Sequence, residues 1–190
     1  MTNSGFLLGA HIGADLRRYR SITQGIPADS PLGVRHWLSA FSPRFLPMLL
    51  CRVAHKLFTL KLGALAKVVS LVNFLWFGLE IAVRCPIGKG LFFPHTQGTV
   101  IGAASIGENA TIYHGVTIGA KELDLGYTQS ARPTVGNDVT LGSGAKVLGG
   151  IHIGNRVRIG ANTVVIESVP DEALVVGAAA RILGRSNLTT

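Results

Sequence analysis

The chain contains little cysteine, few acidic residues and few aromatic residues. Of its 190 residues, two are cysteines (Cys51 and Cys85), and 10 are Asp or Glu against 18 Lys or Arg. Two cysteines without metal-type spacing exclude a disulfide framework and a cysteine-based zinc site, so we expect no bound metal. Aromatic residues make up 7% of the chain, and no set of stacking aromatics accompanies the basic charge. We therefore expect no nucleic-acid partner.

Long apolar runs are also scarce. Residues 65–83 form the most apolar stretch, but its core at 68–79 still contains Ser70, Asn73 and Gly78. This core is too short to span a bilayer and suits a buried or interfacial helix. The start of the chain has no charged segment followed by an apolar core, the mark of a secretion signal. We therefore expect a cytoplasmic protein.

The basic charge is concentrated at the N-terminal end. Residues 1–67 carry nine Lys or Arg against Asp15 and Asp29, a net charge of +7, whereas the other 123 residues carry nine basic and eight acidic side chains. Apolar residues recur there at helical spacing, so residues 1–80 are predicted to form a basic, largely helical cap. Two interpretations of its basic face stay open: a solvated surface, or peripheral contact with the inner face of the membrane.

A repeat of six residues occupies the rest of the chain. From Ile87 to Val169 an aliphatic residue recurs about every six positions, and Gly follows it at set offsets. A helix repeats at 3.6 and a half-buried strand at 2, so a period of six indicates a parallel β-helix. Three such segments make one triangular coil, which predicts a mostly β fold with about four coils over residues 81–169. The predicted buried rungs are Ile81, Ile87, Phe93, Val100, Ile106, Ile112, Ile118, Val135, Leu141, Val147, Ile153, Ile159 and Val165.

Two irregularities interrupt the repeat. The step from Phe93 to Val100 is seven residues, which places an inserted residue close to His95, and a longer break leaves a loop at residues 121–134. Loops that project from a rigid scaffold are common locations for sites. Residues 170–190 are predicted to form a C-terminal tail. The flat lateral faces of such an array, with outward-facing His114 and His152, suit a three-fold assembly, so we predict a homotrimer.

His95 and Glu80 are the candidate catalytic pair. A neutral imidazole near pH 7 suits the removal of a proton from an alcohol or thiol, and a carboxylate on its second ring nitrogen stabilises the imidazolium. Glu80 is the only acidic residue between Asp29 and Glu108, and it precedes His95 by 15 residues, close to one coil of the repeat. On spacing alone, a capping Glu80 beside a structural His95 is an equal alternative.

Several short motifs follow one another in fixed order between residues 78 and 184. They are Ile87-Gly88-Lys89-Gly90, Pro94-His95, Val100-Ile101-Gly102, Val116-Thr117-Ile118-Gly119, the run from Gly142 to Gly149 and the run from Ile159 to Val165. Their order and spacing resemble those of serine acetyltransferases, in the left-handed β-helix, hexapeptide-repeat acyltransferase superfamily. The resemblance implies an O-acetyltransferase that uses acetyl-CoA as co-substrate and forms a trimer with sites between adjacent subunits.

The resemblance also assigns roles to single residues. It places the catalytic base at His95 and its orienting carboxylate, an aspartate in the family, at Glu80. A basic side chain that meets the CoA phosphates falls on Arg158. The family's other CoA contacts, largely backbone groups of the later coils, fall on Gly119, Ala120, Gly144, Ala145 and Ala161. We expect backbone N–H groups near Gly119 to stabilise the oxyanion of the tetrahedral intermediate.

Two departures from the family pattern concern the acceptor. The family has Asp immediately before its catalytic His, where this chain has Pro94, and Arg-His-Pro in the loop, where this chain has Ala131-Arg132-Pro133. Pro94 offers no acceptor to an ammonium group, whereas Arg132 can still bind a carboxylate. We therefore favour a sugar or cell-surface polysaccharide precursor over a small amino acid as acceptor. Serine acetylation in cysteine biosynthesis is the alternative, and a non-catalytic β-helix scaffold is a further alternative.

Overall fold

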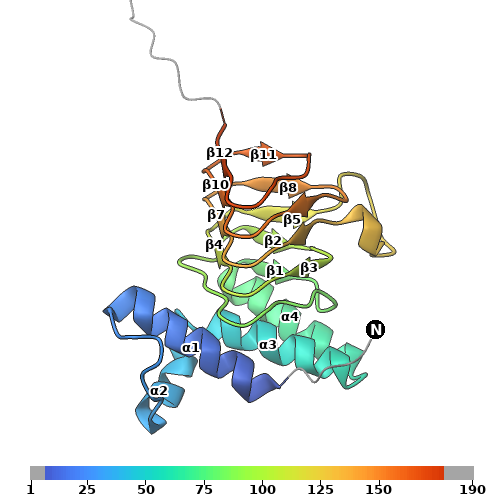
Figure 1. Cartoon of the computed structure of the whole chain (residues 1–190). Helices are drawn as coiled ribbons and strands as arrows, with labels where there is room; N and C mark the ends of the chain where they lie inside the picture. The colour runs from blue at the N-terminus through green and yellow to red at the C-terminus, as the bar shows by residue number, and fades with distance from the viewer. Residues whose placement is uncertain (1–6, 178–190) are drawn as a thin grey trace, which may run out of the picture.

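The computed structural model describes residues 7–177, which form a helical base with a parallel β-helix standing on it (Figure 1). The base consists of α1 (Leu8–Gln24), α2 (Val34–Leu38), the 3-10 helix η1 (Ser39–Phe41), α3 (Leu46–Thr59) and α4 (Gly63–Phe77). The last of these helices ends at Phe77, and the first strand begins at Leu79. Of the predicted C-terminal tail, residues 178–190 lie outside the described part of the chain.

The helix ends follow from local sequence. Gly25 and Gly78 adopt positive φ angles of 67° and 60° after α1 and α4, and the N–H of each donates to a carbonyl of the preceding turn. A left-handed residue at this position ends a helix, and Gly adopts it without steric cost. Pro47 lies in the first turn of α3, where its missing N–H costs no helical hydrogen bond. The buried face of α1 includes Ile12 and Leu16.

Three parallel sheets form the β-helix. The five-stranded sheet consists, in spatial order, of β1 (Leu79–Ile81), β2 (Thr99–Ile101), β5 (Thr117–Gly119), β8 (Lys146–Leu148) and β11 (Val164–Val165). The four-stranded sheet consists of β12 (Leu174–Val175), β10 (Arg158–Ile159), β7 (Thr140–Leu141) and β4 (Thr111–Ile112). The three-stranded sheet consists of β3 (Ser105–Ile106), β6 (Thr134–Val135) and β9 (His152–Ile153). Every described pairing is parallel, and the predicted left-handed β-helix is confirmed.

The buried faces of the strands carry the predicted rungs, with one exception. Val100, predicted as a rung, faces outward and is 37% exposed, whereas Ile101 is 1% exposed and lies in register with Ile118 of β5. The prediction of Val100 is wrong because the extra residues form a turn before β2, closed by a hydrogen bond of 3.1 Å from the N–H of Thr99 to the carbonyl of Thr96. This turn moves the buried position one residue along the chain. The other predicted rungs are buried.

A buried ion pair fastens the base to the first coil. Nε and Nη2 of Arg52, on α3, donate to the carboxylate of Asp15, on α1, at 2.8 and 3.0 Å, and both side chains are almost fully buried. The remaining guanidinium donors bind the carbonyls of Ile87 and Gly88, each at 2.6 Å. Asp15 also accepts the N–H of Leu91 at 2.9 Å. Because both charges have several hydrogen-bond partners, their burial is tolerated and fixes how the helices sit on the β-helix.

Candidate active site

One edge of the five-stranded sheet is built from stacked left-handed residues. At this edge the chain turns into each strand, and the residues with positive φ are Gly78, Gly98, Gly115, Gly144 and Asn162. Backbone hydrogen bonds of 2.8–3.0 Å join each turn to the one below it. A Cβ atom on Gly115 would lie 3.5 Å from Cα of Gly144, and a Cβ on Gly144 would collide with the side chain of Asn162. Glycine therefore keeps most of this edge, which we call the glycine edge, narrow, and the side chain of Asn162 lies against Gly144.

His95 lies at the lower end of the glycine edge, in the turn before β2. Its ring meets the ring of His114 edge to face, with centroids 5.7 Å apart and planes at 78°, and both side chains are exposed. The two turns stack because the N–H of Gly115 donates to the carbonyl of Gln97 at 2.9 Å. The sequence interpretation treated His114 only as an exposed or subunit-interface residue. Its separation from His95, one coil plus one inserted residue, was the signal that places the two rings together.

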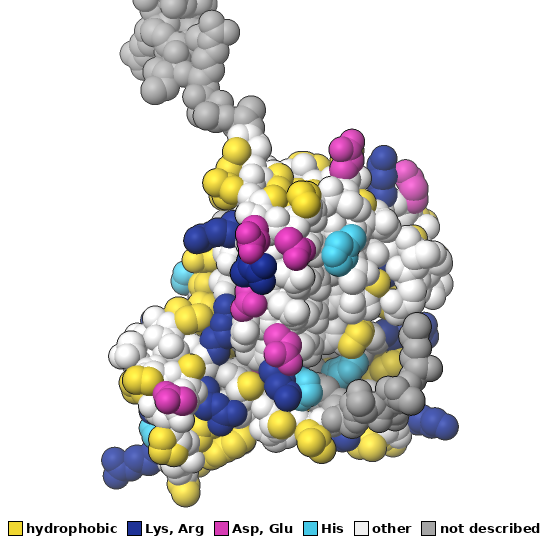
Figure 2. Space-filling model, viewed as in Figure 1, with side chains coloured by type: hydrophobic (Ala, Val, Ile, Leu, Met, Phe, Trp, Pro, Cys, Tyr) yellow, Lys and Arg dark blue, Asp and Glu magenta, His cyan; other side chains and the backbone are white. Residues whose placement is uncertain are grey.

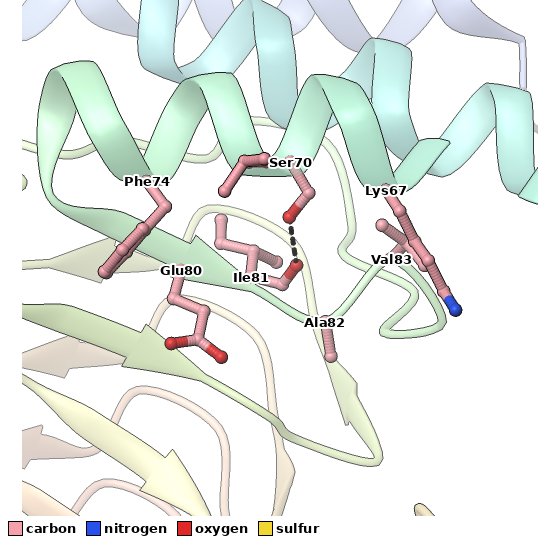
Figure 3. Close-up of a pocket in the computed structure, with 8 residues that line it drawn as sticks. Lys67, Ser70, Phe74, Glu80, Ile81, Ala82 and Val83 are labelled. Atoms are coloured by element: carbon pink, nitrogen blue, oxygen red, sulfur yellow. Dashed lines mark hydrogen bonds between the residues drawn. The ribbon is translucent and has the colours of Figure 1, made fainter. Parts of the chain in front are cut away.

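Glu80 lies on β1 of the five-stranded sheet and, within the described residues, makes no hydrogen bond to His95 in the turn before β2. Its partner in register is Val100, and its side chain is exposed on the outer face of β1. Figure 3 shows it below Phe74, at one end of a cavity of about 340 Å³ between α4 and β1. At the other end of this cavity the amine of Lys67 points away from the carboxylate. The role of Glu80 as the group that orients His95 stays a prediction.

The predicted CoA contacts lie in three places. Gly144, Ala145 and Ala161 lie on or beside the glycine edge above His114, whereas Gly119 ends β5 and Ala120 follows it, at the opposite edge of the same sheet. A Cβ atom on Gly119 would meet no atom within 4 Å, so its backbone is open to a ligand. Ala145 is different. It is fully buried, its N–H donates to Gly142 and its carbonyl accepts from Thr117, so its backbone has no group left for CoA.

Ala120 and Arg158, two of the residues predicted to contact CoA, lie in different surroundings. Ala120 lines a cavity of about 420 Å³ together with Gly149, Gly150 and residues of the 121–134 loop. Arg158 is exposed on β10, in the four-stranded sheet, whereas His114 lies in the turn before β5 of the five-stranded sheet. A ligand bound on the glycine edge would therefore contact Arg158 only if it extended past the turn that joins β10 to β11.

The guanidinium group of Arg132 makes its hydrogen bonds within the protein, to the 121–134 loop and the adjacent coil. Its Nε donates to Oδ2 of Asp124 at 3.0 Å, Nη1 to the carbonyl of Gly102 at 2.9 Å, and Nη2 to the carbonyl of Asp124 at 3.0 Å. Its guanidinium carbon lies 4.0 Å from the centroid of the Tyr127 ring, a cation–π contact. The hydroxyl of Tyr127 in turn donates to the carbonyl of Ala103 at 2.6 Å, and burial raises the pKa of this phenol. These contacts of Arg132 therefore hold the 121–134 loop against the coil.

Pro94, the other residue predicted to contact the acceptor, is half-buried next to His95.

The two cysteines cannot act as nucleophiles at neutral pH. Burial raises the pKa of Cys51 to about 11 and that of Cys85 to about 12, and both thiols are free. The thiolate is the reactive form, so neither side chain suits an acyl-enzyme intermediate. Among residues 7–177, no group of three His, Cys, Asp or Glu side chains is close enough to hold a metal ion. The chemistry that this surface supports is proton transfer by an exposed histidine.

Comparison with known proteins places this site in a family. Residues 132–167 match the model of the bacterial transferase hexapeptide (six repeats) family. Serine acetyltransferase of Synechococcus elongatus is 40% identical over 147 residues, which cover 77% of this chain and 59% of that enzyme. Serine acetyltransferase of Helicobacter pylori is 44% identical over 137 residues, which cover 71% of this chain and 78% of that enzyme. The chain belongs to the serine acetyltransferase family.

Solved structures of the family agree. Neisseria gonorrhoeae serine acetyltransferase in complex with serine is 28% identical, with a TM-score of 0.74 over 95% of this chain and 70% of that one. A serine acetyltransferase in complex with CoA is also 28% identical, with a TM-score of 0.74 over 93% of this chain and 69% of that one. The chain spans 59% of the length of the Synechococcus serine acetyltransferase.

The family overturns one expectation from the sequence. The favoured acceptor, a sugar or polysaccharide precursor, is wrong as an interpretation because the relatives at 40–44% identity are serine acetyltransferases. The structure supplies a physical reason. Arg132 was read as a free cation for an anionic acceptor, but its donors are already bound to Asp124 and Gly102. The loop sequence Ala131-Arg132-Pro133 therefore does not indicate a sugar acceptor.

Proposed function

We propose that this protein is a serine O-acetyltransferase that transfers the acetyl group of acetyl-CoA to the hydroxyl of serine. The observation that carries the proposal is the exposed His95 at the foot of the glycine edge, in a chain that belongs to the serine acetyltransferase family. An exposed imidazole beside a narrow edge of glycines is accessible to both a small hydroxyl and a long thioester. The further alternative, a non-catalytic scaffold, has no use for this arrangement.

The reaction follows from the chemistry of an imidazole base. His95 takes the proton of the serine hydroxyl as its oxygen attacks the thioester carbonyl, which forms a C–O bond and a tetrahedral oxyanion. Because Gly119 lies at the opposite edge of the sheet from His95, backbone N–H groups near Gly119 are proposed to stabilise that oxyanion across the subunit interface of the proposed trimer. Collapse breaks the C–S bond, and the CoA thiolate leaves with the proton from the imidazolium. Glu80 is proposed to stabilise the imidazolium while it carries the charge.

The glycine edge is proposed to hold the pantetheine arm of acetyl-CoA. Gly144 and Ala161 lie above His114 in the stack, so a ligand along this edge runs from His95 towards the upper coils. Close approach of an extended chain to backbone requires small residues, which these positions supply. Arg158 is the cation proposed to reach the phosphates from the next corner.

The assembly and location belong to the same proposal. The single chain leaves His95 and His114 exposed, and a homotrimer would close the site with a neighbouring subunit. A monomeric mass by light scattering at micromolar concentration would contradict the trimer. We propose a cytoplasmic location, with the helical base at the inner face of the membrane. The free, buried thiols of Cys51 and Cys85 are compatible with a reducing compartment.

Serine-dependent release of the CoA thiol tests the activity. The purified protein is mixed with acetyl-CoA, and thiol release is followed with and without serine. We expect kcat/KM for serine above ~10⁴ M⁻¹s⁻¹, the usual range of enzymes. His95→Ala should lower kcat by about 10²–10⁴-fold and leave the affinity for acetyl-CoA close to that of the wild type. Arg35→Ala is the control, because Arg35 is exposed on α2, in the helical base.

Two outcomes would overturn the proposal. Acetyl-CoA binding without serine-dependent thiol release would indicate a different acceptor or a scaffold. Full activity of His95→Ala, with Arg35→Ala also active, would remove His95 from the mechanism.

A further inference from the structure

The α3–α4 hairpin exposes an unusual amount of apolar surface at the base of the molecule. On α4, the exposed fraction is 54% for Leu65, 57% for Val68, 53% for Leu71, 66% for Leu75 and 72% for Trp76. Only Ala66 and Asn73 of this helix are classed as buried. Residues three and four apart share one helix face, so the leucines and Val68 form a continuous stripe along α4. Large exposed apolar patches of this kind mark sites of association.

The charged residues around this apolar stripe are basic, which favours a partner with negative charge. No Asp or Glu occurs between Asp29 and Glu80, so α2, α3 and α4 contain no acidic residue. Lys61 lies exposed in the turn before α4, and Lys67 is exposed on α4 itself. Figure 2 shows the same division on one face of the molecule: most of the acidic side chains there lie over the β-helix, and the base shows basic and hydrophobic ones. The nearest carboxylate on a neighbouring element is Glu80, at the end of the cavity under α4.

We propose that the outer face of α4 is a docking surface for an anionic lipid bilayer, on which the helix lies parallel to the membrane plane. Among residues 7–177, no helix is long and apolar enough to cross a membrane. An apolar stripe flanked by lysines is the composition of an interfacial helix. Trp76 lies at the C-terminal end of the stripe, and the indole ring favours the boundary between lipid and water. The proposal does not depend on the acetyl transfer, because its test uses no substrate.

A second copy of this chain would be the competing occupant. A helix from another copy could also cover the stripe, but that copy would bring its own lysines and no acidic residue from the same hairpin. Two such faces would place like charges together, which opposes their association. An anionic surface neutralises the lysines while it accepts the apolar side chains.

Vesicle binding by the full chain tests the proposal. Trp37→Phe leaves Trp76 as the single tryptophan, since the sequence contains two. In this background, phosphatidylglycerol vesicles should shift the Trp76 emission to the blue and carry the protein to the top of a flotation gradient. Phosphatidylcholine vesicles should bind at least about tenfold more weakly, and added salt should reduce binding to phosphatidylglycerol through screening.

Two double variants distinguish binding through the α4 surface from nonspecific binding of vesicles by other exposed apolar residues. Leu71→Glu/Leu75→Glu should weaken vesicle binding by at least about tenfold, because the helix loses two aliphatic side chains that enter the bilayer and gains two negative charges. Leu174→Glu/Val176→Glu is the matched control: both residues are exposed (70% and 67%) at the opposite end of the β-helix. Far-ultraviolet circular dichroism establishes that each variant is folded, and Lys61→Glu/Lys67→Glu replaces the leucine pair if that pair does not fold.

The proposal is overturned by either of two results. Equal binding of the α4 variant, the control and the wild type would show that another surface meets the vesicle. Absence of vesicle binding, with a fall in the solution mass of the α4 variant by light scattering, would show that a second copy covers this face.

Discussion

The rings of His95 and His114 contact each other edge to face across two stacked turns of the β-helix, with their centroids 5.7 Å apart. The contact joins the candidate base to a residue one coil above it on the glycine edge. A ring that is packed on one side has fewer orientations, so His114 limits the orientations in which His95 meets a hydroxyl.

Substitution of His114 tests this positioning. Aromatic pairs contribute about 0.5–1.5 kcal/mol, and at this exposed site we expect the lower end, which corresponds to a fall in kcat of roughly two- to fivefold for His114→Ala. His114→Phe keeps a ring and should restore most of the loss, with KM for acetyl-CoA unchanged. Steady-state kinetics of both variants measure the effect. Equal loss in the Phe and Ala variants would mean that the imidazole acts through its nitrogens rather than as a packed ring.

The buried ion pair should dominate the stability of the base. Asp15→Asn leaves the buried guanidinium of Arg52 without its counter-charge, and loss of one partner of such a pair costs about 3–5 kcal/mol. Urea unfolding at neutral pH measures the change. Arg156→Ala breaks an ion pair whose side chains are 58% and 67% exposed, so it should leave the unfolding midpoint nearly unchanged. A shift for Asp15→Asn no larger than that for Arg156→Ala would contradict the structural role of the pair.

Removal of Arg132 should loosen the 121–134 loop. The loop would lose the guanidinium contacts to Asp124, Gly102 and Tyr127, so limited digestion with chymotrypsin should cleave it roughly tenfold faster. Arg132→Lys should be intermediate, since an ammonium group cannot make the same set of planar contacts. Lys121→Ala, which removes an exposed loop cation, serves as control. Unchanged cleavage of Arg132→Ala would return Arg132 to the role of a free substrate ligand.

The structure predicts a loss of stability on mild acidification. Burial lowers the pKa of His55, and of His11, against the opposing effect of their hydrogen bonds to the carbonyls of Val83 and Leu7. Between the lowered folded pKa and the unfolded value of about 6.5, the folded protein binds fewer protons, so stability falls as pH falls below about 6.5. Urea midpoints at pH near 7.5 and near 5.5 should differ, and less so in His55→Gln. The same difference in both proteins would exclude His55 as its source.

The sequence predicted the β-helix well because its core is one-dimensional. Each rung depends on a six-residue spacing, which a single chain displays directly, and the resemblance of the motifs to serine acetyltransferases added the handedness. The error at Val100 occurred where two aliphatic residues are adjacent. The following Gly102 indicated Ile101 as the rung, since Ile106 and Ile118 also precede a glycine.

The site was predicted less completely, because it depends on contacts between coils and on loop closure. The pairing of His95 with His114 requires the register of β2 on β5, which the inserted turn conceals. The occupation of Arg132 depends on how the loop folds back onto Gly102, for which the sequence shows no period. In the same way, nothing in the spacing of Asp15 and Arg52 indicated that they meet, because α1 and α3 are placed by packing.

The arginines of the base also have a consequence for the open end of the β-helix. Arg52 binds the carbonyls of Ile87 and Gly88, and Arg18 binds that of Gly90. Unoccupied carbonyls on the first coil would be a template on which the last coil of another molecule adds, and repeated addition gives a fibre. In this protein the arginine side chains of the helical base occupy these carbonyls and cannot extend a β-strand. We therefore expect the base to oppose end-to-end polymerisation.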